Sequence, residues 1–154
     1  MTHDDLVMKL SLATTAMVLY YFLMKIEKSA EGRPYPERKN WNARGWFFLF
    51  LSAVITLPFP ILIHSYNLFG GSVFDFSHLN PVAGGLMGWF VYTLPAYLFH
   101  RASHEFTFVW KWTHQMHHAP VRNDAASSSV VHPIESVVYA SMFVLVGQAL
   151  LGLS

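Results

Sequence analysis

Residues 82–99 read VAGGLMGWFVYTLPAYLF, an apolar run without a charged side chain. A helix that crosses the hydrocarbon of a bilayer needs roughly 20 mainly apolar residues, so this run is predicted to span a membrane. Three other stretches come near the same length, at residues 6–26, at residues 46–63 and from about residue 133 to the chain end. Pro58 and Pro60 are expected to kink or end the second of these. We therefore predict an all-α, multi-pass membrane protein with about four transmembrane helices.

The composition of the chain supports this fold class. Hydrophobic residues make up 53% of the chain and charged residues only 12%, against about 25% charged residues in an average soluble domain. A net charge of +1 provides no basic field for nucleic acid, which we exclude as a partner. Because the chain has no cysteine, any metal must bind to His, Asp or Glu. Without internal repeats, we expect one membrane-embedded domain over residues 1–154.

Lysine and arginine are distributed unevenly between the predicted loops. Cytoplasmic loops are enriched in these residues, and this asymmetry sets the orientation of membrane proteins. The loops between the first two predicted spans and after the third contain Lys25, Lys28, Arg33, Arg38, Lys39, Arg44, Arg101, Lys111 and Arg122. The predicted topology therefore places residues 100–132 on the cytoplasmic face, in either the bacterial inner membrane or the endoplasmic reticulum.

Two histidine clusters lie in this cytoplasmic segment. The motif HRASH supplies His100 and His104, and HQMHH supplies His114, His117 and His118. Positions i and i+4 share one face of a helix, so each cluster can direct several imidazoles toward one point. These five residues are the predicted metal ligands, and a short interfacial helical segment is expected to carry the second cluster. The alternative is that histidines simply collect in a polar interfacial segment.

The two clusters can serve one metal centre only if the chain bends between them. In a straight helix their midpoints would lie about 21 Å apart, whereas bonds between imidazole and metal are about 2 Å long. Residues 106–110 are weak helix formers, so we predict the bend between Glu105 and Thr113. Trp110 and Trp112 are interpreted as anchors in the headgroup layer.

The type of ligand does not by itself choose the metal, because imidazole binds Zn, Cu and Fe. The HExxH motif of zinc hydrolases is absent, although Glu105 directly follows His104. A haem needs only one or two axial histidines and would leave the HxxHH motif unexplained. The number of histidines at a membrane surface fits two non-haem iron ions.

Three polar residues near the clusters are additional candidates. His132 and Glu105 are interpreted either as further metal ligands or as hydrogen-bond partners that orient the ligands, and Asp124 as a further orienting group. The alternatives are a polar residue at a helix mouth for His132 and solvated surface charges for Glu105 and Asp124. Pro133 suits a first helical turn, where Glu135 is favourable without any catalytic role.

The segment from about residue 98 to residue 137 resembles the superfamily of sterol desaturases and fatty acid hydroxylases, which are integral membrane di-iron enzymes. HRASH matches its first histidine box, HxxxH, and HQMHH matches its second box, HxxHH, with Trp112 in front of it. HPIE at residues 132–135 matches the HPxE element that often opens the next membrane helix. Only the N-terminal part of the family pattern is present, because the chain reaches Ser154 without a third HxxHH box. We therefore expect a C-terminally truncated histidine-box oxygenase domain.

The resemblance implies a membrane-bound oxidoreductase that uses O2 to hydroxylate or desaturate a fatty acid or a sterol. It also implies two iron ions as cofactor, a lipid substrate that enters from the bilayer, and a separate redox protein as electron donor. One alternative is a histidine-rich membrane protein that binds or transports metal. Transport predicts ionisable residues inside the spans, and the predicted spans hold almost none apart from Lys9. The other alternative is an inactive fragment that lacks the third box.

Overall fold

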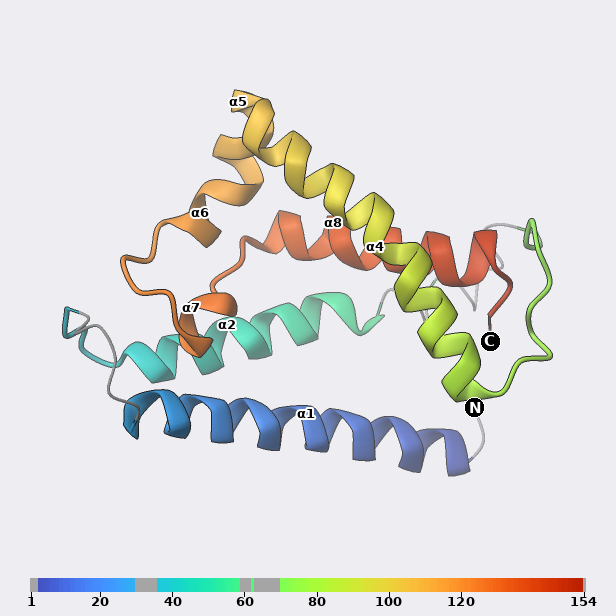
Figure 1. Ribbon diagram of the computed structural model, residues 1–154, viewed down its shortest axis with the longest axis horizontal. Helices are drawn as coiled ribbons and strands as arrows, with labels where there is room; N and C mark the ends of the chain where they lie inside the picture. Colours follow the sequence, from blue (N-terminus) through green and yellow to red (C-terminus); the bar gives the residue numbers. More distant parts are fainter. Residues whose placement is uncertain (1–2, 30–35, 59–61, 63–69, 154) are drawn as a thin grey trace.

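The computed structural model describes residues 3–29, 36–58, 62 and 70–153 of the chain. Within these ranges the chain forms helices and no strand, which confirms the all-α prediction. Figure 1 shows the arrangement of α1 (His3–Ser29), α2 (Trp41–Thr56), α4 (Pro81–Glu105), α5 (Thr107–Val109), the π-helix η1 (Trp110–His114), α6 (Gln115–His118), α7 (Ala125–Ser128), α8 (Pro133–Val144) and the π-helix η2 (Leu145–Leu150).

Helix α8 lies at the centre of the molecule. It packs against α2 on one side and against α4 on the other, while the short α7 lies against α1 and α2 (Figure 1). Two aromatic pairs join α4 to α8, with Phe99 edge-on to Tyr139 at 5.3 Å and Tyr92 edge-on to Phe143 at 5.5 Å between ring centroids. Because Phe99 directly precedes His100, this packing fixes the end of α4 that carries the first histidine motif.

Two helices among the described residues are long and apolar enough to cross a membrane, namely α4 and the continuous helix formed by α8 and η2 (Pro133–Leu150). A core helix of a soluble protein can pass the same test, but such a helix would be mostly buried. Here only 11% of the apolar window of α4 and 22% of that of α8–η2 are buried. These helices correspond to the third and fourth predicted spans. The first predicted span lies in α1 and residues 46–56 of the second lie in α2, and the crossing of the membrane by these two segments stays a prediction.

The helix limits follow local sequence signals. Helix α4 begins at Pro81, where the Asn80 side chain accepts a hydrogen bond from the backbone N–H of Ala83. Helix α2 ends at Thr56, two residues before Pro58, as the prediction for Pro58 required. Pro60 lies outside the described residues. Helix α4 continues past the predicted limit at residue 99 to Glu105, so the first histidine motif forms its last turns.

Candidate metal centre

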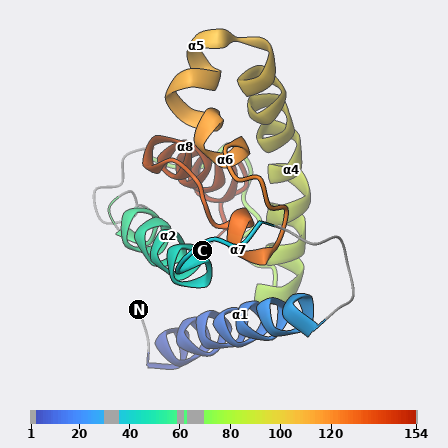
Figure 2. The same ribbon diagram turned by 90° about the vertical axis from the view of Figure 1, so that its left-hand side faces the viewer.

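The predicted bend between the two histidine motifs lies at Phe106. This residue is extended, with φ −103° and ψ 112°, and it separates α4 from α5. The following segment α5–η1–α6 folds back, so that the two motifs form the arms of a helical hairpin (Figure 2). The prediction that the chain bends between Glu105 and Thr113 is confirmed.

The returning arm of the hairpin contains a π-helical turn. In η1 the backbone N–H of Gln115 donates to the carbonyl oxygen of Trp110, five residues earlier. Such turns hold one more residue than an α-helical turn and often occur at functional sites. This turn ends at His114, and α6 then places His118 one turn further along the chain.

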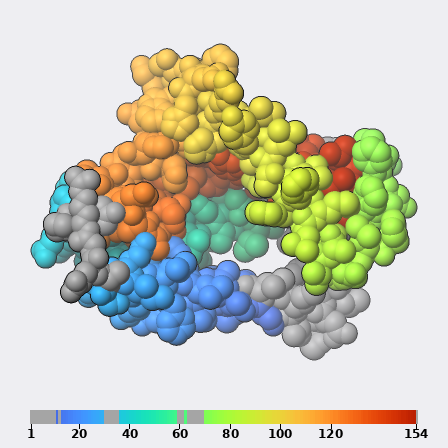
Figure 3. All heavy atoms as spheres, in the orientation of Figure 1, coloured from blue at the N-terminus to red at the C-terminus, as the bar shows by residue number. Residues whose placement is uncertain are grey.

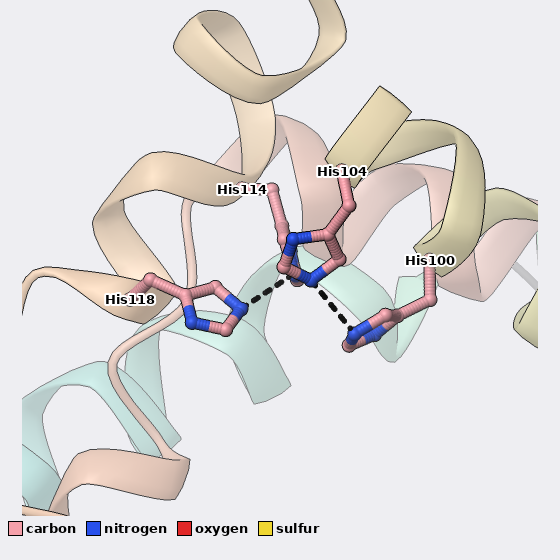
Figure 4. Close-up of side chains that lie close together, drawn as sticks. All are labelled: His100, His104, His114 and His118. Carbon is pink, nitrogen blue, oxygen red and sulfur yellow. Dashed lines mark hydrogen bonds between the residues drawn. The ribbon is translucent and has the colours of Figure 1, made fainter. Parts of the chain in front are cut away.

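Four imidazoles converge between the two arms, as Figure 4 shows. His100 and His104 come from α4, His114 from η1 and His118 from α6, and one ring nitrogen of each lies within 4.8 Å of the others. The Nε2 atoms of His100 and His104 are 3.2 Å apart, and those of His114 and His118 are 3.0 Å apart.

These separations fit a shared metal ion. Two nitrogens that each bind one metal at about 2.1 Å lie roughly 3.0–3.4 Å apart when their bonds form angles of 90° to 109°. Without a metal, each of these contacts is an N–H···N hydrogen bond in which one ring donates and the other accepts. The donor set of four imidazoles therefore suits Zn, Cu or Fe.

Burial lowers the pKa values of His100, His114 and His118 and so favours the neutral form that metals bind. His114 is fully buried, and this burial lowers its pKa to about 4, with the neighbouring His104 and His117 acting in the same direction. Burial also lowers the pKa of His118, again with a contribution from the other histidines. His100, His104 and His118 are exposed, so the group opens on one side.

His117 lies beside this group without joining it. Its ring centroid is 5.4 Å from that of His114 and 5.3 Å from that of His118, but its nitrogens are not among the four that converge. Its Nδ1 atom is buried and has no hydrogen-bond partner within the described part of the chain. Metal binding by His117 stays a prediction.

The three additional candidates have other contacts in the structure. His132 caps α8, because its Nδ1 accepts a hydrogen bond from the backbone N–H of Ile134 at 3.2 Å. Glu105 forms an exposed ion pair with Arg101 at 2.8 Å. Asp124 caps α7 through the backbone N–H of Ser127. The proposed roles of these residues at a metal stay predictions.

Two residues at the site were not identified from the sequence. Glu135 is fully buried, and its Oε1 lies 2.6 Å from Nδ1 of His114. The ring of Trp110 lies 5.3 Å from His118 and 5.4 Å from His104, whereas Trp112 is exposed as an interfacial anchor should be. The spacing of Trp110, four and eight residues before His114 and His118, was a usable signal, because such positions share one helix face.

Fold and site together define a class of protein, a helical chain with candidate membrane helices and a group of four histidines that can hold a metal ion. The sequence profile described as Fatty acid hydroxylase matches residues 85–154, a range that contains all four histidines and Glu135. This match confirms the resemblance to the fatty acid hydroxylase and sterol desaturase superfamily in the C-terminal part of the chain. The family is membrane-associated, typically uses iron and points to oxidoreductase activity. No curated protein and no solved structure gave a match to the chain.

Proposed function

We propose that this chain is a membrane-bound, iron-dependent oxidoreductase that uses O2 to hydroxylate or desaturate a lipid, either a fatty acid or a sterol. The observation that carries the proposal is the convergence of His100, His104, His114 and His118 on one point. The family match over residues 85–154 supports the same reaction class.

The four converging histidines would hold one iron ion, and the second iron expected from the sequence would bind on the side of His117. The buried Nδ1 of His117, without a partner within the described residues, supports this arrangement. Bound iron supplies, with O2 and electrons from a separate redox protein, the oxidising power that breaking an unactivated C–H bond requires.

The protein side chains bind the metal and shape its surroundings. The lowered pKa values of His114 and His118 keep these ligands free of competing protons at neutral pH. Trp110 covers one side of the imidazoles, since its ring lies 5.3–5.9 Å from those of His104, His114 and His118. An aromatic cover of this kind limits the access of water to the ligands.

A large and mainly apolar cavity lies next to the site and supports a lipid substrate. It has a volume of about 660 Å³ and lies between α1, α2, α4 and α8. Figure 3 shows the molecule hollowed between α1 and α4, with α2 and α8 behind. The lining residues include Tyr20, Leu49, Ser52, Tyr92, Tyr139 and Phe143. Ser136 also lines the cavity and directly follows Glu135, so the cavity and the carboxylate that contacts His114 lie on the same turn of α8.

The same proposal places the reaction at a membrane surface. The poorly buried faces of α4 and α8–η2 would contact lipid, and the histidine group at the end of α4 would lie near the cytoplasmic interface. A lipid from the bilayer would then enter with its chain in the cavity. The redox protein that donates electrons would approach from the cytoplasm.

The test uses the protein purified in detergent micelles, depleted of metal and reloaded with Fe2+ under anaerobic conditions. Iron content is measured, and O2 is then admitted with a chemical reductant and either an oleoyl lipid or a sterol. We expect bound iron and a hydroxylated or desaturated product that is lost in His118→Ala. The matched control is His78→Ala, because His78 is exposed and lies outside the histidine group.

The stoichiometry separates the one-iron and two-iron forms of the proposal. Two irons per chain, falling to one in His117→Ala, support the two-iron form. One iron in both proteins overturns the two-iron form and leaves the four-histidine site. A protein that binds metal but yields no oxidised product from either lipid is a metal-binding protein and overturns the proposed reaction.

A further inference from the structure

The sequence HPIE at residues 132–135 starts α8 and aims one carboxylate at the histidine group. His132 caps the helix, and Pro133 occupies the first helical position, where its missing N–H costs nothing. Glu135 follows in the first turn. Ser136 contacts Ser52 of α2 through a 3.1 Å hydrogen bond, which helps to hold this turn in place.

The side chain of Glu135 reaches one of the converging histidines from behind. Its Oε1 lies 2.6 Å from Nδ1 of His114, and the two side chains are only 3% and 1% exposed. The Nε2 atom of His114, on the other edge of the ring, lies 3.0 Å from Nε2 of His118. His114 therefore contacts the carboxylate with one nitrogen and the histidine group with the other.

No other carboxylate occupies a comparable position in the described part of the chain. Glu135 is the one acidic side chain there that is fully buried. Glu105 lies closer in sequence to the first motif, but it is exposed and pairs with Arg101. Burying a carboxylate is costly unless it is hydrogen-bonded, so the contact with His114 requires a physical reason.

We propose that Glu135 is a positioning residue that holds His114 in the tautomer with its proton on Nδ1, so that the lone pair of Nε2 faces the metal. When Glu135 is ionised it can only accept a hydrogen bond, and Nδ1–H of His114 is then the donor within reach. Carboxylates that accept from the remote N–H of a metal-ligating histidine fix the ring orientation and make the ligand more basic. This inference rests on the proposed function only in that a metal binds the four histidines.

The first experiment needs no metal, and a variant serves only to assign signals. The metal-free protein, labelled with 15N in its histidines, is examined by NMR in detergent micelles, and the signals of His114 are assigned by their loss in His114→Gln. We expect the proton of His114 on Nδ1. A proton on Nε2 in the wild-type protein overturns the inference, whatever the protein catalyses.

The second experiment measures metal affinity with matched variants. Co2+ is titrated into metal-free wild type, Glu135→Gln and Asp75→Asn while the absorption of the bound ion is followed. Loss of a carboxylate behind a metal-ligating histidine typically weakens binding roughly 10–100-fold. We expect a loss in this range and an altered Co2+ spectrum for Glu135→Gln. Asp75→Asn removes the same charge from an exposed carboxylate away from the histidine group and should bind Co2+ like the wild type.

The outcomes distinguish the inference from the proposed function. Equal affinities in Glu135→Gln and the wild type overturn the inference, even when iron-dependent activity is present. Failure of the wild type to bind Co2+ or Fe2+ overturns the proposed function, while the tautomer of His114 still decides the inference. Circular dichroism reports whether each variant is folded, and Glu135→Asp, which keeps the charge but shortens the reach, replaces Glu135→Gln if that variant unfolds.

Discussion

Two carboxylates, the partly buried Asp124 and the fully buried Glu135, show how a structural polar cluster differs from a candidate binding site. Asp124 receives hydrogen bonds from Trp41 Nε1 at 3.0 Å, from Arg122 Nε at 2.8 Å and from the backbone N–H of Ser127 at 2.9 Å. Burial acts to raise its pKa, but the hydrogen bonds from Arg122, Ser127 and Trp41 outweigh this effect and lower it. The cluster is closed, because its donors are matched to acceptors that belong to the chain.

The region around Glu135, in contrast, contains buried polar atoms that lack hydrogen-bond partners among the described residues. The Oε2 atom of Glu135 and the Nδ1 atom of His117 are buried without partners among the described residues. Four imidazoles direct one nitrogen each toward a common point, where a metal ion could bind all four lone pairs. Buried polar groups in native proteins are nearly always paired, so the unpaired Oε2 of Glu135 and Nδ1 of His117 support the proposed binding of a metal here. The comparison predicts that changes at the histidine group affect metal binding, whereas changes at Asp124 affect folding stability.

The largest expected effect is the loss of metal binding on removal of one ligand. His118→Ala deletes one of the four nitrogens, and the remaining three leave a coordination position open. Affinity for Co2+ should fall by more than the roughly 100-fold upper limit for losing a partner behind a ligand. Titration of the metal-free protein measures this affinity, and an unchanged affinity would remove His118 from the ligand set.

The second effect is a dependence of stability on pH in the metal-free protein. The pKa of His114 is about 4 in the folded chain and 6.5 in the reference state. As the pH falls below 6.5, the unfolded chain takes up a proton that the folded chain does not, so stability decreases until the pH nears 4. The contribution of His114 to this loss is at most about 3 kcal/mol, and because its partner Glu135 also titrates, it is read as the difference between the wild type and His114→Gln. Thermal unfolding in detergent micelles with a chelator, between pH 7.5 and pH 5, measures this loss, and His114→Gln should remove most of it.

A smaller effect is expected at the closed cluster. Asp124→Ala removes the cap of α7 and the acceptor of the Trp41 indole N–H, which should reduce the free energy of unfolding by about 2 kcal/mol. Affinity for Co2+ should stay at the wild-type value. A weakened metal site in this variant would break the proposed distinction between the two regions.

The smallest effect is expected at the exposed ion pair next to His100. Arg101 and Glu105 are 61% and 55% exposed in their side chains, so solvent screens their attraction. Arg101→Gln should change the free energy of unfolding by less than about 1 kcal/mol. Urea or thermal unfolding checks this value, and a larger change would reveal a role for Arg101 beyond the pair.

The features that follow from local sequence were predicted correctly. The helical class, the bend at Phe106 and the start of α8 at Pro133 depend on hydrophobic runs, weak helix formers and capping residues. Sequence reasoning did not separate His118, which joins the four converging imidazoles, from His117, which lies beside them, because i+3 and i+4 both neighbour position i on a helix. The π-helical turn η1, which ends at His114, sets the register between the two motifs, and local propensities do not predict it.

Contacts between distant parts of the chain explain the remaining misses. Glu135 is 21 residues from His114 in the sequence, and the two meet only because α8 packs against η1. In the sequence, the position of Glu135 in the first turn of a helix already explains the acidic residue, because carboxylates are favourable at helix N-termini. The sequence therefore did not indicate the contact between Glu135 and His114. Trp110 was interpreted from its residue type as a headgroup anchor, although its spacing from His114 and His118 already placed the three on one face.

The compactness of the histidine hairpin in sequence affects the order in which the protein assembles. The four converging histidines fall within nineteen consecutive residues, whereas Glu135 comes later in the chain. Closing a loop of about ten residues takes roughly 10–100 ns, which is far shorter than the time of about 0.1 s that a ribosome needs to add one residue. During synthesis the hairpin is therefore complete before α8 emerges. We expect the nascent chain to capture its metal first and to dock the helix that carries Glu135 onto a preformed group.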